Sequence, residues 1–348
     1  MSVIKIGIIG CGSITRYRHA PEYYSNKNCK IVAFSDSNFE RAKELANQYG
    51  GKAYQNYEDI LNDPTIDAVS VCTPNYTHAT ITIEALKSGK HVLCEKPIAT
   101  NLEDAKKMIE TAKETQKILM IGHNQRFAPA HQKAKEILKK NELGRVITFR
   151  TAFKHAGPEF WSADKTKRTW FFNKEASFFG VLGDLGIHKV DLIRWLLEEE
   201  ISEVNAIAYT LDKKYEDGNP IEVEDNAICI LKTSGGKIGT IEVSWTNYGS
   251  EENSTILYCE KGVIKIYASQ EYDLIIEKRD DGEIYYKLGG ISTNTRQIKS
   301  GVIDAFIESI INNRPPEVSG EDGYEALRVI FACLKSAKER NWVLISEA

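Results

Sequence analysis

Three side chains suited to acid–base chemistry stand next to apolar segments of this sequence. Lys96 lies between Glu95 and Pro97, directly after the apolar run 91–94, and the proline disfavours helical backbone at Lys96 and permits a cis peptide bond. Asp184 and His188 are four residues apart at the start of a long apolar segment, so both lie on one face of the predicted helix. Histidine titrates near neutral pH, so His188 is suited to remove a hydroxyl proton while hydride leaves the same carbon.

Other interpretations of these residues remain open. A lysine in a loop usually faces solvent, and a histidine on an apolar helix is often a core residue, which Asp191 could satisfy here. Metal binding by Asp184 and His188 is disfavoured, because no further cluster of histidine, cysteine or acidic residues lies nearby in the sequence. We therefore expect no metal ion at this site.

A glycine-rich turn closes the apolar run 3–9 and predicts a nucleotide site. Gly10 permits a tight turn, and Gly12 lets the backbone approach a pyrophosphate at the start of the next helix, beside Ser13 and Ile14. Asp36 stands at the end of the second predicted strand, where a carboxylate can bind ribose hydroxyls and repels a 2′-phosphate. The pattern therefore favours NAD over NADP as the cofactor.

Two features leave alternatives at this turn. Ser37 and Arg41 could grip the 2′-phosphate of NADP if Asp36 swung aside, although an arginine on a helix usually faces solvent. Thr15 stands where the G-x-G-x-x-G/A pattern has its last small residue, and a glycine turn also occurs without any ligand.

A polar cluster follows the predicted strand 68–72. Thr73, Pro74 and Asn75 come directly after it, and Asn75 offers both a donor and an acceptor. We expect this cluster to line the path of the cofactor toward its nicotinamide. His78 belongs either to that path or to the packing of its own loop.

Short apolar runs alternate with amphipathic segments from Val3 to about Ile121, which is typical of a parallel sheet wrapped by helices. This rhythm predicts an α/β, doubly wound domain over residues 1–123. We expect strands at 5–9, 30–34, 68–72, 91–94 and 118–121, and helices at 14–24, 40–49, 77–87 and 102–115.

The pattern changes after Gly122 and predicts a second, α+β domain over residues 124–348. A run of strands with turn residues between them, from 201 to about 287, predicts a large, mostly antiparallel open sheet. The remaining expected elements are a strand at 146–153 and helices at 129–139, 181–197, 302–311 and 324–338, with an irregular aromatic stretch up to Phe179.

Composition excludes several classes of protein. The net charge of -4 and the lack of a basic stripe argue against nucleic-acid binding, and we interpret the short basic run 165–168 as a solvated loop. No apolar stretch approaches the roughly 20 residues that cross a bilayer, and no signal-peptide pattern precedes the first strand. The seven cysteines never occur as C-x-x-C, which predicts reduced thiols and a cytoplasmic protein without membrane contact.

In these motifs the sequence resembles the Gfo/Idh/MocA family, which includes glucose-fructose oxidoreductase and inositol dehydrogenase. The E-K-P and D-x-G-x-H sequences are together specific, and the resemblance covers essentially the whole chain. The residues that carry it are Gly10-Cys11-Gly12, Asp36, Thr73 to His78, Glu95-Lys96-Pro97, Gly122 to Phe127, Asp184 to His188 and Ser319 to Gly323.

The resemblance implies an N-terminal Rossmann domain and a C-terminal domain whose open sheet forms a homodimer or homotetramer. It implies that His188 is the general base, that Asp184 orients the substrate or the imidazole, and that Lys96 stabilises the reacting oxygen. It also extends the cofactor site to Glu95, Lys96, Asn124 and Arg126. Substrate would contact Lys96, Asp184 and His188 beside an aromatic wall that includes Trp161 and Trp170, although some of these aromatic residues could be core.

Two departures from the family pattern affect these expectations. Phe178-Phe179-Gly180 replaces a glycine cluster, which predicts a bulkier pocket roof, and Thr15 weakens the cofactor preference. Our hypothesis is an NAD-dependent oxidoreductase that acts on a secondary hydroxyl of a small-molecule cyclic polyol or sugar. The alternatives are an NAD-dependent glycosidase that uses transient oxidation and a nucleotide-sensing regulator without turnover.

Overall fold

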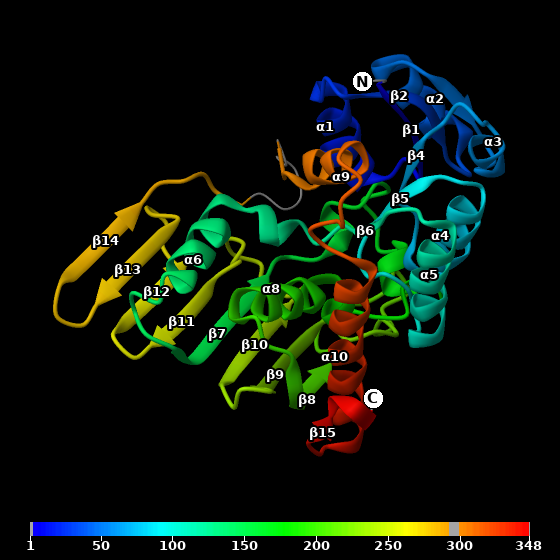
Figure 1. The fold of residues 1–348 in the computed structure, drawn as a ribbon. Helices are drawn as coiled ribbons and strands as arrows, with labels where there is room; N and C mark the ends of the chain where they lie inside the picture. Colours follow the sequence, from blue (N-terminus) through cyan, green and yellow to red (C-terminus); the bar gives the residue numbers. More distant parts are fainter. Residues whose placement is uncertain (1–2, 292–298, 348) are drawn as a thin grey trace.

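The computed structural model describes residues 3–291 and 299–347, and two β-sheets organise them (Figure 1). The first sheet has six parallel strands in the order β3-β2-β1-β4-β5-β6. This order, with crossover helices between the strands, is that of a Rossmann domain. Its strands are β1 (Ile4–Ile9), β2 (Cys29–Ser35), β3 (Lys52–Tyr54), β4 (Ala68–Val71), β5 (His91–Cys94) and β6 (Leu119–Ile121).

The central strands of this sheet are apolar because helices cover both of their faces. Every residue of the central strand β4 is buried, as expected for a parallel strand enclosed on two sides, and every residue of the edge strand β6 is buried as well. The alternating pattern therefore predicted this α/β arrangement correctly, although it missed the short elements β3 and α3. The helices are α1 (Ala20–Ser25), α2 (Phe39–Tyr49), α3 (Glu58–Leu61), α4 (His78–Lys87) and α5 (Leu102–Thr115).

Two helices that sequence periodicity predicted as single α-helices begin with a π-helical turn. Residues Thr15–His19 form the π-helix η1 before α1, and residues Leu182–Gly186 form the π-helix η6 before α8 (Ile187–Leu197). Such turns often occur at functional sites, and Asp184 lies within η6.

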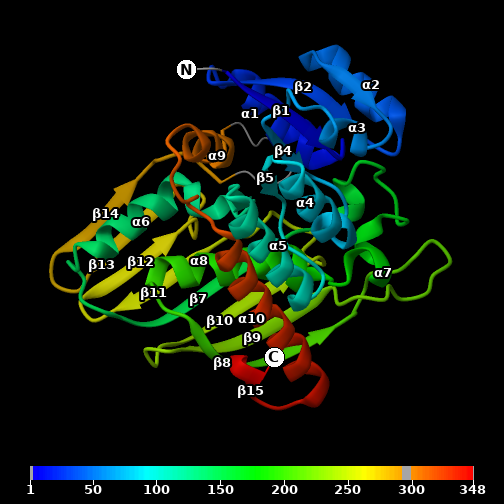
Figure 2. The same ribbon diagram turned by 45° about the vertical axis from the view of Figure 1, so that its right-hand side comes forward.

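The second sheet has nine strands in the order β14-β13-β12-β11-β7-β10-β9-β8-β15. Only the pairing of β10 with β7 is parallel, so the expected mostly antiparallel sheet is confirmed. The helices α6 (Pro129–Lys139), α8 and α10 (Gly320–Glu339) lie along one face of it (Figure 2). The strands are β7 (Val146–Lys154), β8 (Ile201–Tyr209), β9 (Asn226–Thr233), β10 (Ile238–Ser244), β11 (Thr255–Cys259), β12 (Gly262–Ile266), β13 (Leu274–Lys278), β14 (Gly282–Tyr286) and β15 (Val343–Leu344).

The C-terminal part of the chain returns to the first sheet. The amide of Ile121 in β6 donates to the carbonyl of Val318 (3.1 Å), and Ser319 and Asp322 form a capping box that starts α10. Gly320 and Gly323 let this helix approach α5 and β6, because a Cβ at either position would come within 2.9 Å of an isoleucine side chain. The remaining helices are α7 (Lys174–Ser177) and α9 (Val302–Ile311), which lies against α1, together with the short segments η2 (Asn75–Thr77), η3 (Asn124–Phe127), η4 (Pro158–Phe160), η5 (Trp170–Phe172) and η7 (Ile345–Glu347).

No helix in the described part of the chain combines the length and the apolar character needed to cross a bilayer.

Candidate active site

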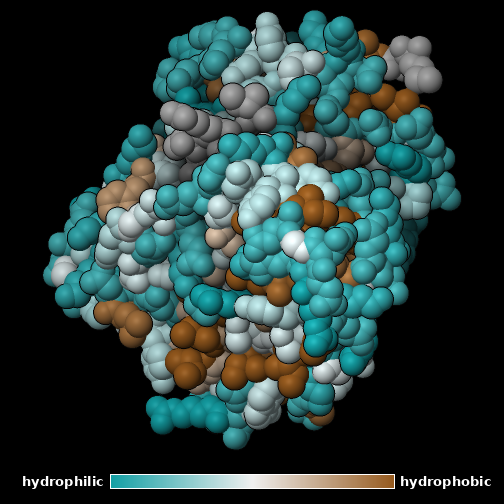
Figure 3. All heavy atoms as spheres, turned by 90° about the vertical axis from the view of Figure 1, so that its left-hand side faces the viewer, coloured by the Kyte–Doolittle hydropathy of each residue, from teal (hydrophilic) through white to brown (hydrophobic). Residues whose placement is uncertain are grey.

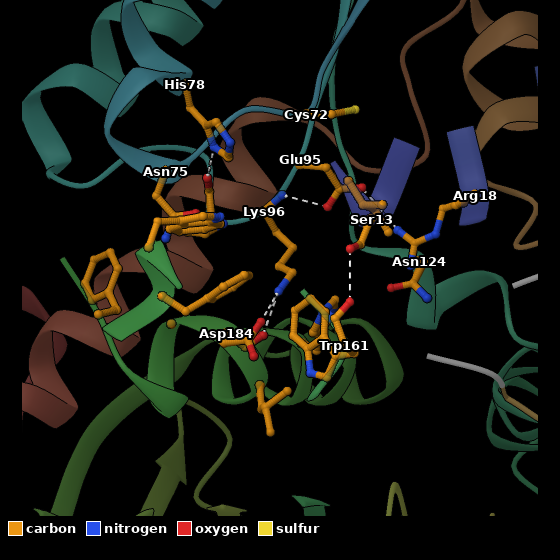
Figure 4. Close-up of a pocket in the computed structure, with 18 of the residues that line it drawn as sticks. Ser13, Arg18, Cys72, Asn75, His78, Glu95, Lys96, Asn124, Trp161 and Asp184 are labelled. Atoms are coloured by element: carbon orange, nitrogen blue, oxygen red, sulfur yellow. Dashed lines mark hydrogen bonds and ion pairs between the residues drawn. The ribbon is translucent and has the colours of Figure 1, made fainter. Parts of the chain in front are cut away.

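A pocket of about 950 Å³, including its open mouth, lies between the strand ends of the Rossmann sheet and the start of the α8 segment. Lys96 reaches into it from the loop after β5 and meets Asp184 of η6 (Figure 4). His188 lines the same pocket from α8. The structure therefore brings together the three residues in which the sequence indicated acid–base chemistry, although 88 residues separate Lys96 from Asp184.

An ion pair joins the two sides of the pocket. The Lys96 ammonium donates to Oδ1 of Asp184 (2.7 Å) and to the carbonyl oxygen of the same residue (2.8 Å). The Trp245 indole donates to the other carboxylate oxygen, Oδ2, at 3.1 Å. The peptide bond between Lys96 and Pro97 is cis. Asp184 thus holds the lysine ammonium in the pocket and is itself held by a buried tryptophan.

His188 is a neutral imidazole at physiological pH. Burial, and secondly the positive charge of Lys96, hold the pKa of His188 well below its usual 6.5. Its Nδ1 has no hydrogen-bond partner among the described residues, and both ring nitrogens of the buried His123 are likewise unpartnered there. The two rings meet edge to face with centroids 6.0 Å apart. A neutral imidazole that faces a pocket can accept a proton.

Asp191 does not satisfy His188, contrary to the core alternative considered from the sequence. The Asp191 carboxylate accepts two hydrogen bonds from Arg126, at 2.8 and 2.6 Å. Arg126 also donates to Asp322 at 2.9 Å and is buried. Arg126 therefore ties η3 to α8 and α10, and it is not among the residues that line the pocket. The spacing of residues along the sequence did not show that Asp191 and Asp322, on two other helices, pair with Arg126.

Glu95 lines the pocket as a buried carboxylate that has an arginine and a histidine as partners. Its Oε1 accepts from Arg18 (3.1 Å) and lies 2.9 Å from Nε2 of His19. Burial raises the pKa of Glu95, but the hydrogen bond from His19 and the charge of Arg18 outweigh it and lower the pKa to about 2. Gly122 is needed beside it, because a Cβ there would lie 3.0 Å from the carboxylate.

The glycine turn fits a dinucleotide. Gly10 has a φ of +94°, and a Cβ there would lie 2.6 Å from the Cys72 carbonyl, whereas a Cβ at Gly12 would meet nothing within 4 Å. That open space allows a phosphate to approach the backbone. The hydroxyl of Thr15 donates to the Gly10 carbonyl (2.6 Å), so the threonine closes the turn instead of disrupting it. Asp36 accepts from the amide of Cys11 at 2.7 Å.

The other predicted cofactor residues divide between the pocket wall and its surroundings. Ser13, Ile14, Thr73, Asn75, His78, Glu95 and Asn124 line the pocket together with Lys96. Gly10, Gly12, Asp36, Ser37 and Pro74 do not line it, and they belong to the turns at the ends of β1, β2 and β4.

His78 lines the pocket, and both of its ring nitrogens also lie close to backbone carbonyls of the surrounding loops. Its Nδ1 lies 2.7 Å from the Pro97 carbonyl and its Nε2 2.9 Å from the Thr73 carbonyl. Burial lowers its pKa. Asn75 similarly donates to the Ser177 carbonyl at 2.9 Å, which fastens the Rossmann sheet to the segment before η6.

Comparison with known proteins identifies the family. Residues 4–123 match the model of an oxidoreductase family with an NAD-binding Rossmann fold, and residues 131–265 match the Gfo/Idh/MocA C-terminal domain. The chain belongs to the Gfo/Idh/MocA family.

Its relatives include sugar and polyol dehydrogenases. Myo-inositol 2-dehydrogenase of Thermotoga maritima is 30% identical over 99% of both chains, and levoglucosan dehydrogenase of Pseudarthrobacter phenanthrenivorans is 25% identical over 99% of this chain and 98% of that one. A solved structure of levoglucosan dehydrogenase with NADH superimposes with a TM-score of 0.86 at 25% identity, and all of each chain is covered.

In this Gfo/Idh/MocA protein, the aromatic stretch divides as considered above. Trp161, Trp170 and Phe171 line the pocket, and the last two rings are stacked with centroids 3.8 Å apart. Phe172 is instead fully buried and packs against Trp245. The two tryptophans predicted to contact substrate are therefore in the pocket wall.

Sequence reasoning missed His155, which also lines the pocket. Its Nδ1 accepts from the amide of Gly157 (3.0 Å), so the proton of the neutral ring resides on Nε2. Burial lowers its pKa to about 4, so it offers an uncharged donor. The only signal in the sequence was its position two residues after the strand predicted to end at Phe153.

A second missed residue, Glu224, fixes the start of the catalytic segment. Its Oε1 accepts from the amides of Gly180 (3.0 Å) and Leu182 (3.1 Å), one turn before Asp184. Burial raises its pKa to about 7. Gly180 is required at this point, because a Cβ would lie 1.9 Å from the Glu224 carbonyl oxygen. The Phe178-Phe179-Gly180 departure thus keeps the glycine that this close approach needs, while Phe179 forms part of the pocket wall.

Proposed function

We propose that this protein catalyses NAD(H)-dependent hydride transfer between the nicotinamide and a secondary hydroxyl of a cyclic polyol or sugar. The observation that carries the proposal is the meeting of Lys96, Asp184 and His188 in one pocket that begins at the glycine turn. The names of the relatives support it, since they include dehydrogenases of inositol and of a cyclic sugar. When bound, NAD supplies the hydride acceptor.

His188 would act as the general base. The positive charge of Lys96 and the burial of the ring keep the imidazole unprotonated, so it can take the hydroxyl proton as the carbon is oxidised. Lys96 would donate a hydrogen bond to the reacting oxygen and stabilise its developing negative charge. Asp184 orients that ammonium through the 2.7 Å ion pair.

Substrate would bind against the aromatic wall. Trp161 and Trp170 offer flat apolar surfaces that suit the C–H face of a ring, and neighbouring polar groups offer donors for its hydroxyls. We assign dinucleotide binding to residues 1–123, with Ser13, Ile14, Thr73, Asn75, His78, Glu95 and Asn124 along its path. We assign substrate binding and assembly to residues 124–348.

Assembly as a homodimer or homotetramer would use the uncovered face of the nine-stranded sheet. Ile207 and Ile228 are paired across β8 and β9 and are 60% and 56% exposed, and Ile230 and Tyr209 extend this apolar surface. Hydrophobic residues also gather at the lower end of the molecule, below the Rossmann domain (Figure 3). Contiguous apolar surface of this kind marks interaction sites. Light scattering would measure the assembly, and a monomer at micromolar concentration would contradict it.

A cytoplasmic location is also part of the proposal. All seven cysteines are buried free thiols, and this state suits a reducing compartment.

The activity is tested with purified protein, NAD and a panel of inositols, aldoses, anhydrosugars and glucosides, by absorbance of the reduced cofactor. We expect turnover with at least one neutral cyclic substrate. Protein that binds NAD in a calorimeter but reduces none of it across the panel would contradict the proposal. Release of an aryl group from aryl glycosides, without net NADH, would indicate the glycosidase alternative instead.

A further inference from the structure

Two arginines lie close to the glycine turn, where the adenosine half of a dinucleotide begins. Arg16 is in η1 and Arg41 is in α2. Both guanidinium groups act electrostatically on the Cys11 thiol inside the turn: burial and the Asp36 carboxylate raise its pKa, whereas the two arginines lower it. Arginine is the side chain best suited to bind a phosphate, because its planar fork can contact two oxygens. These arginines would favour NADP if they were available.

A carboxylate from the C-terminal domain occupies Arg41. Its Nη2 forms an ion pair with Oδ1 of Asp164, a residue 123 positions away in the loop after η4. The same loop is fastened to the glycine turn a few residues earlier, where the Ser13 hydroxyl donates to the Trp161 carbonyl at 3.0 Å (Figure 4). Asp164 is therefore held beside the turn by a second contact.

A carboxylate of the Rossmann domain occupies Arg16. Glu44 in α2 accepts from Nη1 and Nη2 of Arg16, at 2.9 and 2.8 Å, so the whole fork of the guanidinium is engaged. Asp36 completes the arrangement, because its two oxygens accept from the amides of Cys11 and Asn38, which fixes the carboxylate at the end of β2. Each of the two arginines is thus already paired with a carboxylate, and Asp36 stands at the end of β2, where a carboxylate can bind the ribose hydroxyls of NAD.

We propose that Asp164 and Glu44 are determinants of the preference for NAD over NADP, because they hold the two arginines that would otherwise bind a 2′-phosphate. The inference assumes that a dinucleotide binds at the glycine turn, as in the proposed function. A 2′-phosphate has to displace a carboxylate from each guanidinium, whereas the ribose hydroxyl of NAD has no such requirement. The preference therefore depends on both domains, and Asp36 supplies only part of it.

The test measures dissociation constants of NAD⁺ and NADP⁺ by isothermal titration calorimetry for wild type, Asp164→Asn and Glu44→Gln. We expect each amide variant to bind NADP⁺ about tenfold more tightly, which corresponds to about 1.4 kcal/mol, with NAD⁺ affinity changed less than about twofold. The gain is limited because Asp36 remains. Glu216→Gln is the matched control, since it breaks the exposed ion pair of Glu216 with Arg168 in the same loop without touching Arg41.

Asp164→Asn combined with Arg41→Ala separates a released arginine from a merely loosened loop. The proposal expects the second change to abolish the gain in NADP⁺ affinity. An unchanged NADP⁺ affinity in both amide variants, or a gain that survives the loss of Arg41, would overturn it. If wild type binds NAD⁺ but the variants do not behave as expected, this inference is wrong and the proposed function stands. Wild type that binds neither dinucleotide would overturn the inference and the proposed function together.

Discussion

The two ends of the candidate site differ in how far their polar groups are paired. At the dinucleotide end, around the glycine turn, Arg16 and Arg41 each form an ion pair with a carboxylate. At the catalytic end, Nδ1 of His188 and both nitrogens of His123 have no hydrogen-bond partner among the described residues. Paired groups fix a geometry, while an unpartnered neutral imidazole is free to change its protonation state. The dinucleotide end thus has its charges paired, whereas the other end adds to the Lys96–Asp184 ion pair an imidazole that can change its protonation state.

Removal of the ammonium is expected to have the largest effect. Lys96→Ala should lower kcat by about 10³-fold, because the reacting oxygen loses the donor that stabilises its charge. NAD⁺ affinity should stay close to that of wild type, since the dinucleotide end keeps its contacts. Steady-state kinetics and calorimetry measure the two quantities, with Lys87→Ala on the exposed face of α4 as control. A Lys96→Ala enzyme with the kcat of wild type would contradict the catalytic role of Lys96.

Loss of the base should cost somewhat less and should change the pH dependence. His188→Gln should lower kcat by about 10²-fold. Because the pKa of His188 is held well below 6.5, the wild-type rate should stay level through neutral pH and fall only in more acidic solution, as the imidazole becomes protonated. That acidic limb should disappear in His188→Gln. If the rate of the variant falls in acid in the same way as that of wild type, the titration belongs to another group. His91→Asn, which lies outside the pocket, serves as the matched control.

A variant of Arg126 tests whether this residue binds the cofactor or stabilises the fold. The structure predicts that Arg126→Met lowers the free energy of unfolding by about 3 kcal/mol or more, because Asp191 is left as a buried, unpaired carboxylate. NAD⁺ affinity per folded molecule should change little. Denaturant titration and calorimetry measure both, and Arg126→Lys, which keeps the charge, should recover part of the stability. Strongly weakened NAD⁺ binding in a fully stable variant would instead support the cofactor contact expected from the sequence.

The smallest expected effect concerns the folded protein and not its reaction. The stability of the folded protein should decrease in acid. Burial lowers the pKa of His131 to about 3 and the pKa of His91 and His155 to about 4. Below pH 6.5 the unfolded chain takes up protons that the folded protein rejects, so stability falls as the pH drops from about 6.5 towards 4. Glu224, with a pKa raised to about 7, opposes this as a single group.

Burial also lowers the pKa values of His78, His123 and His188, so the histidines together should outweigh Glu224, and the melting temperature should fall by at least about 5 °C between pH 7 and pH 5. Thermal unfolding followed by circular dichroism measures it. His131→Gln should give a shallower dependence, and a melting temperature that is constant over this range would contradict the assignment.

Sequence periodicity predicted most of the fold, because long amphipathic segments bury one face whatever they pack against. The bounds of α5, α6 and α9 agree with the predicted ranges. The elements β3 and α3 were missed because three or four residues carry too little periodicity, and the π-helical turns were missed because an apolar stripe does not distinguish them from an α-helix.

It was predictable that Lys96, Asp184 and His188 share one pocket, because each residue stands at a recognisable junction between elements. The surroundings were not, because they depend on partners that are distant in the chain. Asp191 and Arg126, Asp164 and Arg41, and Glu224 and Gly180 meet only when separate elements pack together. No spacing along the chain indicates these pairs.

The return of the chain at residues 318–323 has a consequence for synthesis on the ribosome. β6 is an edge strand of the Rossmann sheet, and the segment that covers it, Val318 and Ser319, is made about two hundred residues later. Until that segment emerges, the nascent dinucleotide domain carries a bare strand edge of the kind that pairs with other chains. This edge of the Rossmann sheet is therefore covered only when the last helix leaves the ribosome. Truncation near the C-terminus would expose the same edge, in the domain that was translated first.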